Sequence, residues 1–233
     1  MTRGPAEDDA GSPAGRVVPL GVAIDRDEVV RLLGYPDGHP LPSRLAALLD
    51  DTLTTARRLV RGRGVFVRLE PDRAAEVGLK PVTASELIVG IVTVGEEIEA
   101  AAAAASRGGE PTRALLLDAA GSAATEEAAD RLGAVIIGAP AAADRRAVPC
   151  RFSPGYGDWS LQDQPRLFAL LPHAEVGVSL LPSMMMVPRK SVSFAMWLGA
   201  APDRGAGRGC ARCPLDHCRY RREPRRPAEN GRR

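Results

Sequence analysis

The residues best suited to binding chemistry lie together in the second half of the chain. Residues 151–159 read Arg-Phe-Ser-Pro-Gly-Tyr-Gly-Asp-Trp. A proline and two glycines so close together predict a tight turn whose backbone a ligand can approach. The guanidinium of Arg151 matches a carboxylate in bidentate geometry, while Tyr156 and Trp159 offer flat surfaces for a ring. The alternative is a structural loop whose aromatic side chains fill the core.

A second polar stretch follows at residues 179–193. It places three consecutive methionines between two prolines and continues with Arg189 and Lys190. A methionine triplet is more typical of adaptable core packing than of a cofactor contact. The two cations could bind a phosphate or a carboxylate, although such a pair more often lies in a solvated turn.

An acidic row is expected on the long helix that the sequence predicts before these stretches. Asp118, Ser122 and Glu126 are spaced by four residues and so share a helix face, with Glu127 beside them. A carboxylate here could attract a cationic group of a ligand, but we favour a solvated helix face.

The C-terminal segment carries three of the four cysteines. Cys210, Cys213 and Cys218 have C-x2-C-x4-C spacing, which suits tetrahedral zinc or an iron–sulfur cluster better than a disulfide in a cytosolic chain. His217, Cys150 or an external ligand could complete the site, and a three-thiolate cluster or free thiols are also possible. Cys150 itself is expected to be a small buried residue, because no histidine is near it in sequence.

Charge divides the chain into two parts. Its 233 residues carry a net charge of +2, but residues 203–233 contribute +6 and the remainder −4. A basic tail suggests nucleic-acid binding, yet Tyr220 is its only aromatic residue, so docking on an acidic partner is at least as plausible. No apolar run approaches the roughly 18 residues of a membrane helix, and residues 1–16 have no signal-peptide character, so we expect a cytoplasmic protein.

The elements that must position these residues form an α+β pattern. We expect helices over residues 25–33, 43–61, 95–106 and 111–132, a helix start at Ser160 with Asp163, and strands at 65–69, 87–94, 134–138, 176–178 and 192–198. Helices early and hairpin-like strands late favour an α+β fold over a regular βαβ array. We divide the chain into a disordered leader (1–19), a core (20–202) and a cysteine-containing basic tail (203–233).

Taken together, the two polar stretches resemble the activation domain of cobalamin-dependent methionine synthase, particularly its free-standing versions. The resemblance is carried by R-x-S-P-G-Y-G-x-W, an L-F-x-L-L helix, V-G-V-S-L and S-M-M-M-V-P-x-x-S-V-S. Residues 24–29, 92–96 and 117–122 agree more loosely. The resemblance covers about residues 20–200 and implies a twisted antiparallel sheet with packed helices.

The resemblance also implies a function. The family binds S-adenosylmethionine, docks on a corrinoid protein and, with an electron from flavodoxin or another reductase, supports reductive remethylation of cob(II)alamin. Carried over by motif, Arg151 would bind the ligand carboxylate, and Ser153, Gly155 and Tyr156 would lie along the ligand. Cobalt is the nucleophile in this chemistry, so we name no catalytic acid or base.

Some family features have no direct match. No tyrosine lies between Tyr156 and Tyr220, where multidomain members have a tyrosine pair, and Asp25 or Asp27 would have to replace an acidic residue near the start of the domain. Asp158-Trp159 also stands where the multidomain members have a different pair of residues after Gly-Tyr. The rival hypotheses are a small zinc or iron–sulfur electron-transfer protein that uses the C-terminal cysteines, and an interaction module that binds nucleic acid through the tail.

Overall fold

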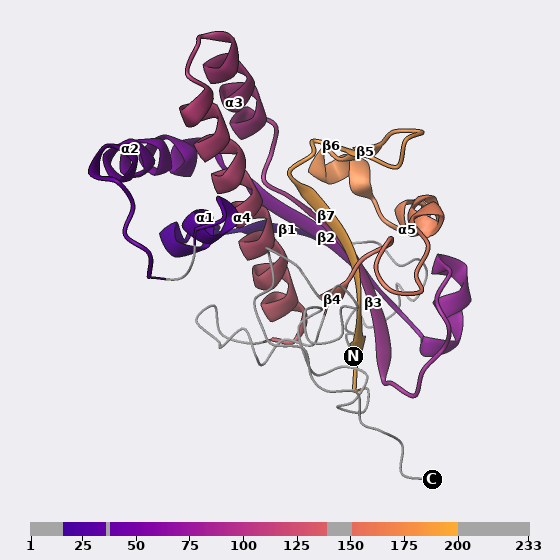
Figure 1. Ribbon diagram of the computed structural model, residues 1–233. Helices are drawn as coiled ribbons and strands as arrows, with labels where there is room; N and C mark the ends of the chain where they lie inside the picture. The colour runs from indigo at the N-terminus through magenta and orange to yellow at the C-terminus, as the bar shows by residue number, and fades with distance from the viewer. Residues whose placement is uncertain (1–15, 36–37, 139–150, 200–233) are drawn as a thin grey trace, which may run out of the picture.

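The computed structural model describes residues 16–35, 38–138 and 151–199 (Figure 1). Its centre is a five-stranded sheet in the order β1-β2-β3-β7-β4, with every neighbouring pair antiparallel. The strands are Arg16–Leu20 (β1), Gly62–Leu69 (β2), Glu86–Thr93 (β3), Arg151–Phe152 (β4) and Ser191–Leu198 (β7). Ser179–Leu180 (β5) and Met186–Val187 (β6) form a separate hairpin.

Helices connect and cover the strands. The α-helices are Arg26–Leu32 (α1), Ser43–Leu59 (α2), Glu97–Arg107 (α3), Pro111–Ile136 (α4) and Gln164–Leu170 (α5). Short 3-10 helices span Pro71–Val77 (η1), Leu161–Asp163 (η3) and His173–Val176 (η4). The carboxylate of Asp25 accepts the N–H of Asp27 at 2.9 Å and caps α1, and Pro111 begins α4 at a position that needs no N–H donor.

The sheet is covered on both faces (Figure 1). Helices α1 to α4 pack on one face, and η1, α5 and η4 pack on the other. Strand β3 shows the consequence, because successive side chains of a strand point to opposite faces. Ile88 and Val92 join the core under the helices, whereas Leu87, Val89 and Ile91 join the second core. Both faces of β3 are therefore apolar, which explains its β-branched run.

The long expected elements are present, but three local expectations are wrong. Residues 16–19, which we assigned to a disordered leader, belong to β1, which pairs with β2. Residues 134–138, which we expected to form a strand, instead contain the last turn of α4 and its C-cap. Leu132 and Ile136, one turn apart, are both buried under the helices, so the apolar run continues the buried side of α4.

The expected strand at residues 176–178 is also misplaced. Val176 ends η4, and the strand that follows, β5, consists of Ser179 and Leu180 alone. The imidazole Nδ1 of His173 lies 2.6 Å from the carbonyl oxygen of Val178, and the backbone N–H of Val178 donates to the carbonyl oxygen of His173 at 3.0 Å, which ties this turn to η4. Both valines are buried because the turn packs on the sheet.

Candidate ligand-binding site

Helix α4 presents four polar side chains at successive turns. Asp118, Ser122, Glu126 and Asp130 follow one another at intervals of four residues. Two cations from other elements meet this row: Lys190 lies at Asp118 and Ser122, and Arg151 lies at Glu126 and Asp130. The solvated helix face that we favoured holds only in part: Asp118 and Glu126 stay 50% and 45% exposed, but Lys190 and Arg151 pair with the row.

Arg151 is held close to α4 by the sheet. Its strand β4 is the edge strand next to β7, where Arg151 is paired with Met196. Its Nη2 atom lies 2.5 Å from a carboxylate oxygen of Asp130 and 3.7 Å from one of Glu126. The guanidinium carbon lies 5.7 Å from the centre of the Phe194 ring, and the side chain is only 15% exposed. A mostly buried guanidinium beside two carboxylates forms a mixed-charge site.

The loop after β4 is a compact turn. Gly155 donates its N–H to the carbonyl oxygen of Trp159 at 2.8 Å, and Tyr156 donates to that of Ser153 at 3.1 Å. Gly155 has a φ of 93°, a left-handed conformation that side chains with a Cβ rarely adopt. The turn predicted from proline and glycine is therefore formed.

The two aromatic residues of this loop have different environments. Trp159 is buried, donates its indole N–H to the carbonyl oxygen of Val77 at 2.8 Å, and packs against Phe152 with ring centres 5.3 Å apart. Tyr156, in contrast, is 69% exposed. Trp159 thus fills the core, as expected if the loop were purely structural, while Tyr156 stays available to a ligand or a partner.

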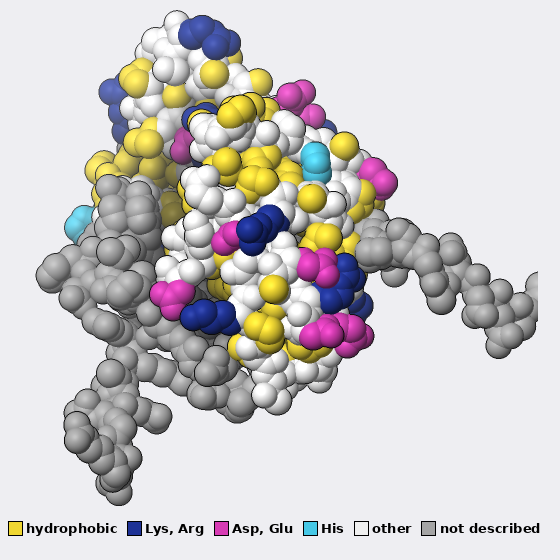
Figure 2. All heavy atoms as spheres, turned by 90° about the vertical axis from the view of Figure 1, so that its right-hand side faces the viewer, with side chains coloured by type: hydrophobic (Ala, Val, Ile, Leu, Met, Phe, Trp, Pro, Cys, Tyr) yellow, Lys and Arg dark blue, Asp and Glu magenta, His cyan; other side chains and the backbone are white. Residues whose placement is uncertain are grey.

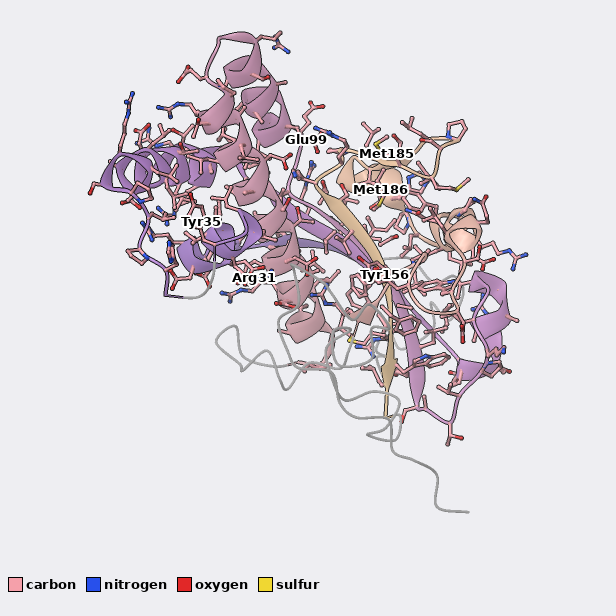
Figure 3. The ribbon with its side chains drawn as sticks, viewed as in Figure 1. Arg31, Tyr35, Glu99, Tyr156, Met185 and Met186 are labelled. Carbon is pink, nitrogen blue, oxygen red and sulfur yellow. The ribbon has the colours of Figure 1, made fainter. Side chains whose placement is uncertain are left out.

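The β5–β6 hairpin adds exposed apolar side chains on the same side of the molecule as α5. Figure 2 shows this face, where hydrophobic side chains alternate with charged ones. Leu181, Met185 and Val187 are exposed, whereas Met186 packs against the second core. In Figure 3, Met185 and Met186 lie on the hairpin, and Tyr156 lies below them in this view. The expectation of core packing therefore holds for Met186 and not for Met185.

Lys190 bridges the β6–β7 turn and α4. Its Nζ atom lies 2.8 Å from a carboxylate oxygen of Asp118 and donates to the hydroxyl of Ser122 at 2.9 Å, and the side chain is 12% exposed. Its backbone N–H donates to the carboxylate of Glu99 on α3 at 2.6 Å. The solvated turn that we expected is wrong for Lys190, but Arg189, 60% exposed, matches it.

Gly121 makes the close approach of Lys190 possible. A Cβ atom at this position would lie 3.1 to 3.3 Å from three carbons of the lysine side chain. The aliphatic part of Lys190 therefore crosses α4 where the helix has no side chain. This contact fixes the turn that connects the exposed hairpin to strand β7.

The cysteines of the metal hypothesis lie outside the described residues. This applies to Cys150, Cys210, Cys213 and Cys218, whose metal binding stays a prediction. Within the described ranges, no group of three or more His, Cys, Asp or Glu side chains is placed to hold a metal ion. In the same part of the chain, no helix combines the length and the apolar character needed to cross a membrane.

Sequence reasoning missed three residues of this region. Asp130 continues the row of Asp118, Ser122 and Glu126 by one more turn, so its spacing could have revealed it. Glu99 and Gly121 had no such signal, because their roles come from contact with Lys190, which is 91 and 69 residues away along the chain. Such long-range contacts exist only in the folded chain.

Comparisons with known proteins find similarity in structure only. No family model matches the sequence, and no curated protein matches it. A crystal structure of the MetH reactivation domain bound to AdoHcy is similar, with a TM-score of 0.61, 16% sequence identity, and coverage of 84% of this chain and 83% of that chain. The chain thus has the α+β fold of that domain, an antiparallel five-stranded sheet with packed helices, as we expected.

Proposed function

We propose that this protein binds S-adenosylmethionine and supports the reductive remethylation of cob(II)alamin on a cobalamin-dependent methionine synthase or a related corrinoid protein. One observation carries the proposal: Arg151, the first residue of the R-x-S-P-G-Y motif, lies beside Glu126 and Asp130. The turn that follows it in the chain exposes Tyr156. Similarity to a reactivation domain that was crystallised with AdoHcy supports the same ligand class.

The charges of the site fit the amino-acid end of this ligand. An α-amino acid presents a carboxylate and an ammonium a few ångströms apart. In our proposal Arg151 receives the carboxylate, and Glu126, which is 45% exposed, receives the ammonium together with Asp130. The ligand would thus replace part of the ion pairing that Arg151 makes with α4 in the described structure.

The loop would hold the nucleoside. The backbone of Ser153 and Gly155 lies open to a ligand because neither residue places a large side chain over the turn, and Gly157 also has a positive φ, of 58°. Tyr156 offers its ring for contact with an adenine or ribose face. Its exposure in the described structure is consistent with a side chain that a ligand covers.

In the proposed reaction the protein supplies position and charge. One electron from a reductase such as flavodoxin converts cob(II)alamin on the partner into cob(I)alamin, which takes the methyl group from the sulfonium and leaves S-adenosylhomocysteine. Arg151 and the α4 carboxylates would fix the methionine part, so that the methyl group points toward the partner. No residue of this chain needs to donate or accept a proton.

Calorimetric titration with S-adenosylmethionine and S-adenosylhomocysteine tests the proposal. Replacing Arg151 with lysine keeps the charge but removes the bidentate geometry, and we expect affinity to fall about 10-fold to 100-fold. Tyr156→Ala removes an exposed ring and should weaken binding about 2-fold to 10-fold without changing the melting temperature. Arg166→Gln, an exposed arginine on α5, is the matched control and should bind like the unmodified protein.

Two results would refute this proposal. The first is that neither compound binds the protein, alone or with a corrinoid partner. The second is that Arg151→Lys and Tyr156→Ala bind as tightly as the Arg166→Gln control, which would place any ligand elsewhere. With a partner present, formation of methylcobalamin followed by its absorption spectrum reports the proposed reaction directly.

A further inference from the structure

A buried aromatic ring lies beside the guanidinium of Arg151. The ring belongs to Phe194 on β7, which is fully buried in the core between the sheet and helices α1 to α4. Arg151 is on the same sheet face, because it is paired with Met196 of that core, and directly opposite residues of antiparallel strands share a face. The guanidinium carbon lies over the ring, 5.7 Å from its centre. At this distance a cation is attracted to an aromatic face.

Gly90 on β3 leaves room for this ring. It is directly opposite Phe194 in the sheet. A Cβ atom at Gly90 would lie 2.8 Å from Cζ and 3.2 Å from Cε1 of the ring, and 3.2 Å from the carbonyl oxygen of Val65. The ring therefore extends over β3 at a point where that strand has no side chain. Because the core around it is closely packed, the ring cannot move away without opening the core.

The contacts of the guanidinium with α4 and with the ring differ in what a ligand does to them. Its Nη2 atom lies 2.5 Å from a carboxylate oxygen of Asp130 and 3.7 Å from one of Glu126. In the proposed function these carboxylates receive the ammonium of the ligand, which weakens their pairing with Arg151. The contact with the Phe194 ring needs no carboxylate and persists when a ligand binds. The ring can therefore hold the guanidinium both before and after binding.

We propose that Phe194 is a positioning residue of the ligand site: its ring, held over Gly90, keeps the guanidinium of Arg151 in place for the carboxylate of an amino-acid ligand. The identity of the ligand rests on the proposed function, whereas the contact between ring and guanidinium does not. A long arginine side chain loses rotamer freedom when it binds a ligand, and a guanidinium that is already held loses less. Removing the ring should therefore weaken binding of the carboxylate end alone.

Two ligands that differ only at this end test the role on the full chain. S-adenosylhomocysteine has the amino-acid end, whereas methylthioadenosine has the same nucleoside and sulfur without the carboxylate and the ammonium. In calorimetric titrations we expect Phe194→Leu to bind S-adenosylhomocysteine about 5-fold to 30-fold more weakly, and methylthioadenosine less than about 2-fold more weakly. A variant that merely loosens the core would lose affinity for both compounds alike.

Phe66→Leu is the matched control. Phe66 on β2 packs against the same core, and the guanidinium carbon of Arg68 lies 5.9 Å from the centre of its ring. The control thus removes a similar contact between an arginine and a phenylalanine outside the proposed site, and it should bind both compounds like the unmodified protein. Gly90→Ala is a second test variant, because its added methyl group must displace the Phe194 ring without removing it. It should show the same selective loss, and it keeps the test valid if circular dichroism shows that Phe194→Leu does not fold.

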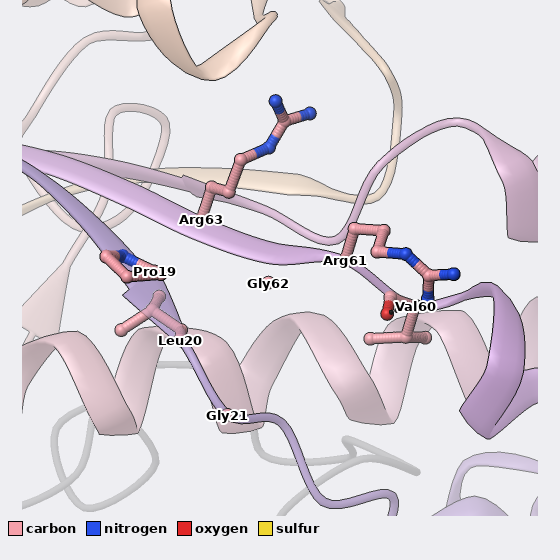
Figure 4. Close-up of a pocket in the computed structure, with 7 residues that line it drawn as sticks. All are labelled: Pro19, Leu20, Gly21, Val60, Arg61, Gly62 and Arg63. Carbon is pink, nitrogen blue, oxygen red and sulfur yellow. Dashed lines mark hydrogen bonds between the residues drawn. The ribbon is translucent and has the colours of Figure 1, made fainter.

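A ligand bound elsewhere would not respond to Phe194. A pocket of about 380 Å³ lies near the other edge of the sheet, where residues 19–21 and 60–63 line it (Figure 4). Strand β3 separates β2, which contributes to this pocket, from β7, which carries Phe194. A compound that bound there would bind Phe194→Leu and Phe66→Leu with equal affinity.

Nuclear magnetic resonance of the unliganded protein tests the contact without any ligand. The Nε–H signal of Arg151 is identified by its absence in Arg151→Lys. A side-chain N–H that is held in place exchanges with water only when its surroundings open, so exchange should be at least about 5-fold faster in Phe194→Leu and unchanged in Phe66→Leu.

The two measurements separate this inference from the proposed function. An exchange rate of Arg151 that is the same in Phe194→Leu and in the unmodified protein would overturn the inference, whether or not a ligand binds. So would an equal change of affinity for both compounds in Phe194→Leu, or no change for either. If neither compound binds the unmodified protein while the exchange rate responds to Phe194→Leu, the proposed function fails and the positioning of Arg151 by Phe194 stands.

Discussion

The indole N–H of Trp159 is expected to fix the loop of residues 153–159 to the second core. Trp159 is 4% exposed, and its N–H bonds to the carbonyl oxygen of Val77 in η1. Trp159→Phe keeps an aromatic ring but removes this donor. The smaller ring costs about 1–2 kcal/mol in packing, and a buried carbonyl deprived of its donor costs about 1–3 kcal/mol more. We therefore expect the free energy of unfolding to fall by about 2–5 kcal/mol in total.

Trp197→Phe is the matched control for this prediction. Trp197 is 7% exposed and lies on the same sheet face, but in the described part of the chain its indole nitrogen makes no hydrogen bond. This variant should lose only the packing contribution of about 1–2 kcal/mol. Urea unfolding followed by circular dichroism measures both, and each kilocalorie should lower the melting temperature by about 2–4 °C. Equal losses in the two variants would show that the Trp159 hydrogen bond does not stabilise the loop.

Two further predictions concern side-chain pairs. Lys190→Met keeps the aliphatic contact with α4 but removes the ammonium. Because the lysine is mostly buried, this variant should lower the free energy of unfolding by about 1 kcal/mol in the same urea experiment. Arg189→Met, at an exposed position, should lower it by less than about 0.5 kcal/mol. The Arg73 guanidinium donates to the carboxylate of Glu76 and holds the pKa of Glu76 below its ordinary value. The pair therefore stabilises the folded state slightly when the pH is above that ordinary pKa, and this stabilisation is lost as the pH falls through the lowered pKa. Glu76→Gln should therefore be slightly less stable than the unmodified protein near neutral pH, and this difference should shrink as pH falls below the ordinary pKa of a glutamate; a difference that stays constant with falling pH would contradict the pairing.

Many elements could be predicted from local sequence. Strand β3 was expected from its β-branched run, β7 from its alternation, and α4 from a proline start followed by apolar residues at helical spacing. These elements are long and strongly patterned, so their local signal agrees with their environment. Strand β1 was missed because five residues that include Pro19 carry little signal of their own and depend on pairing with β2.

The candidate site also combines features that local sequence predicts with features that depend on distant contacts. The sequence by itself determined the turn at residues 153–157, because proline and glycine restrict or permit backbone angles locally, and it identified Arg151 as a group suited to a carboxylate. Only the tertiary structure decided which charges that arginine meets, since Asp130 and Glu126 come from a helix more than 20 residues earlier. It also decided that Trp159 is buried while Tyr156 is exposed. Propensity acts between neighbours in the chain, whereas burial and ion pairing depend on which distant segments the fold brings together.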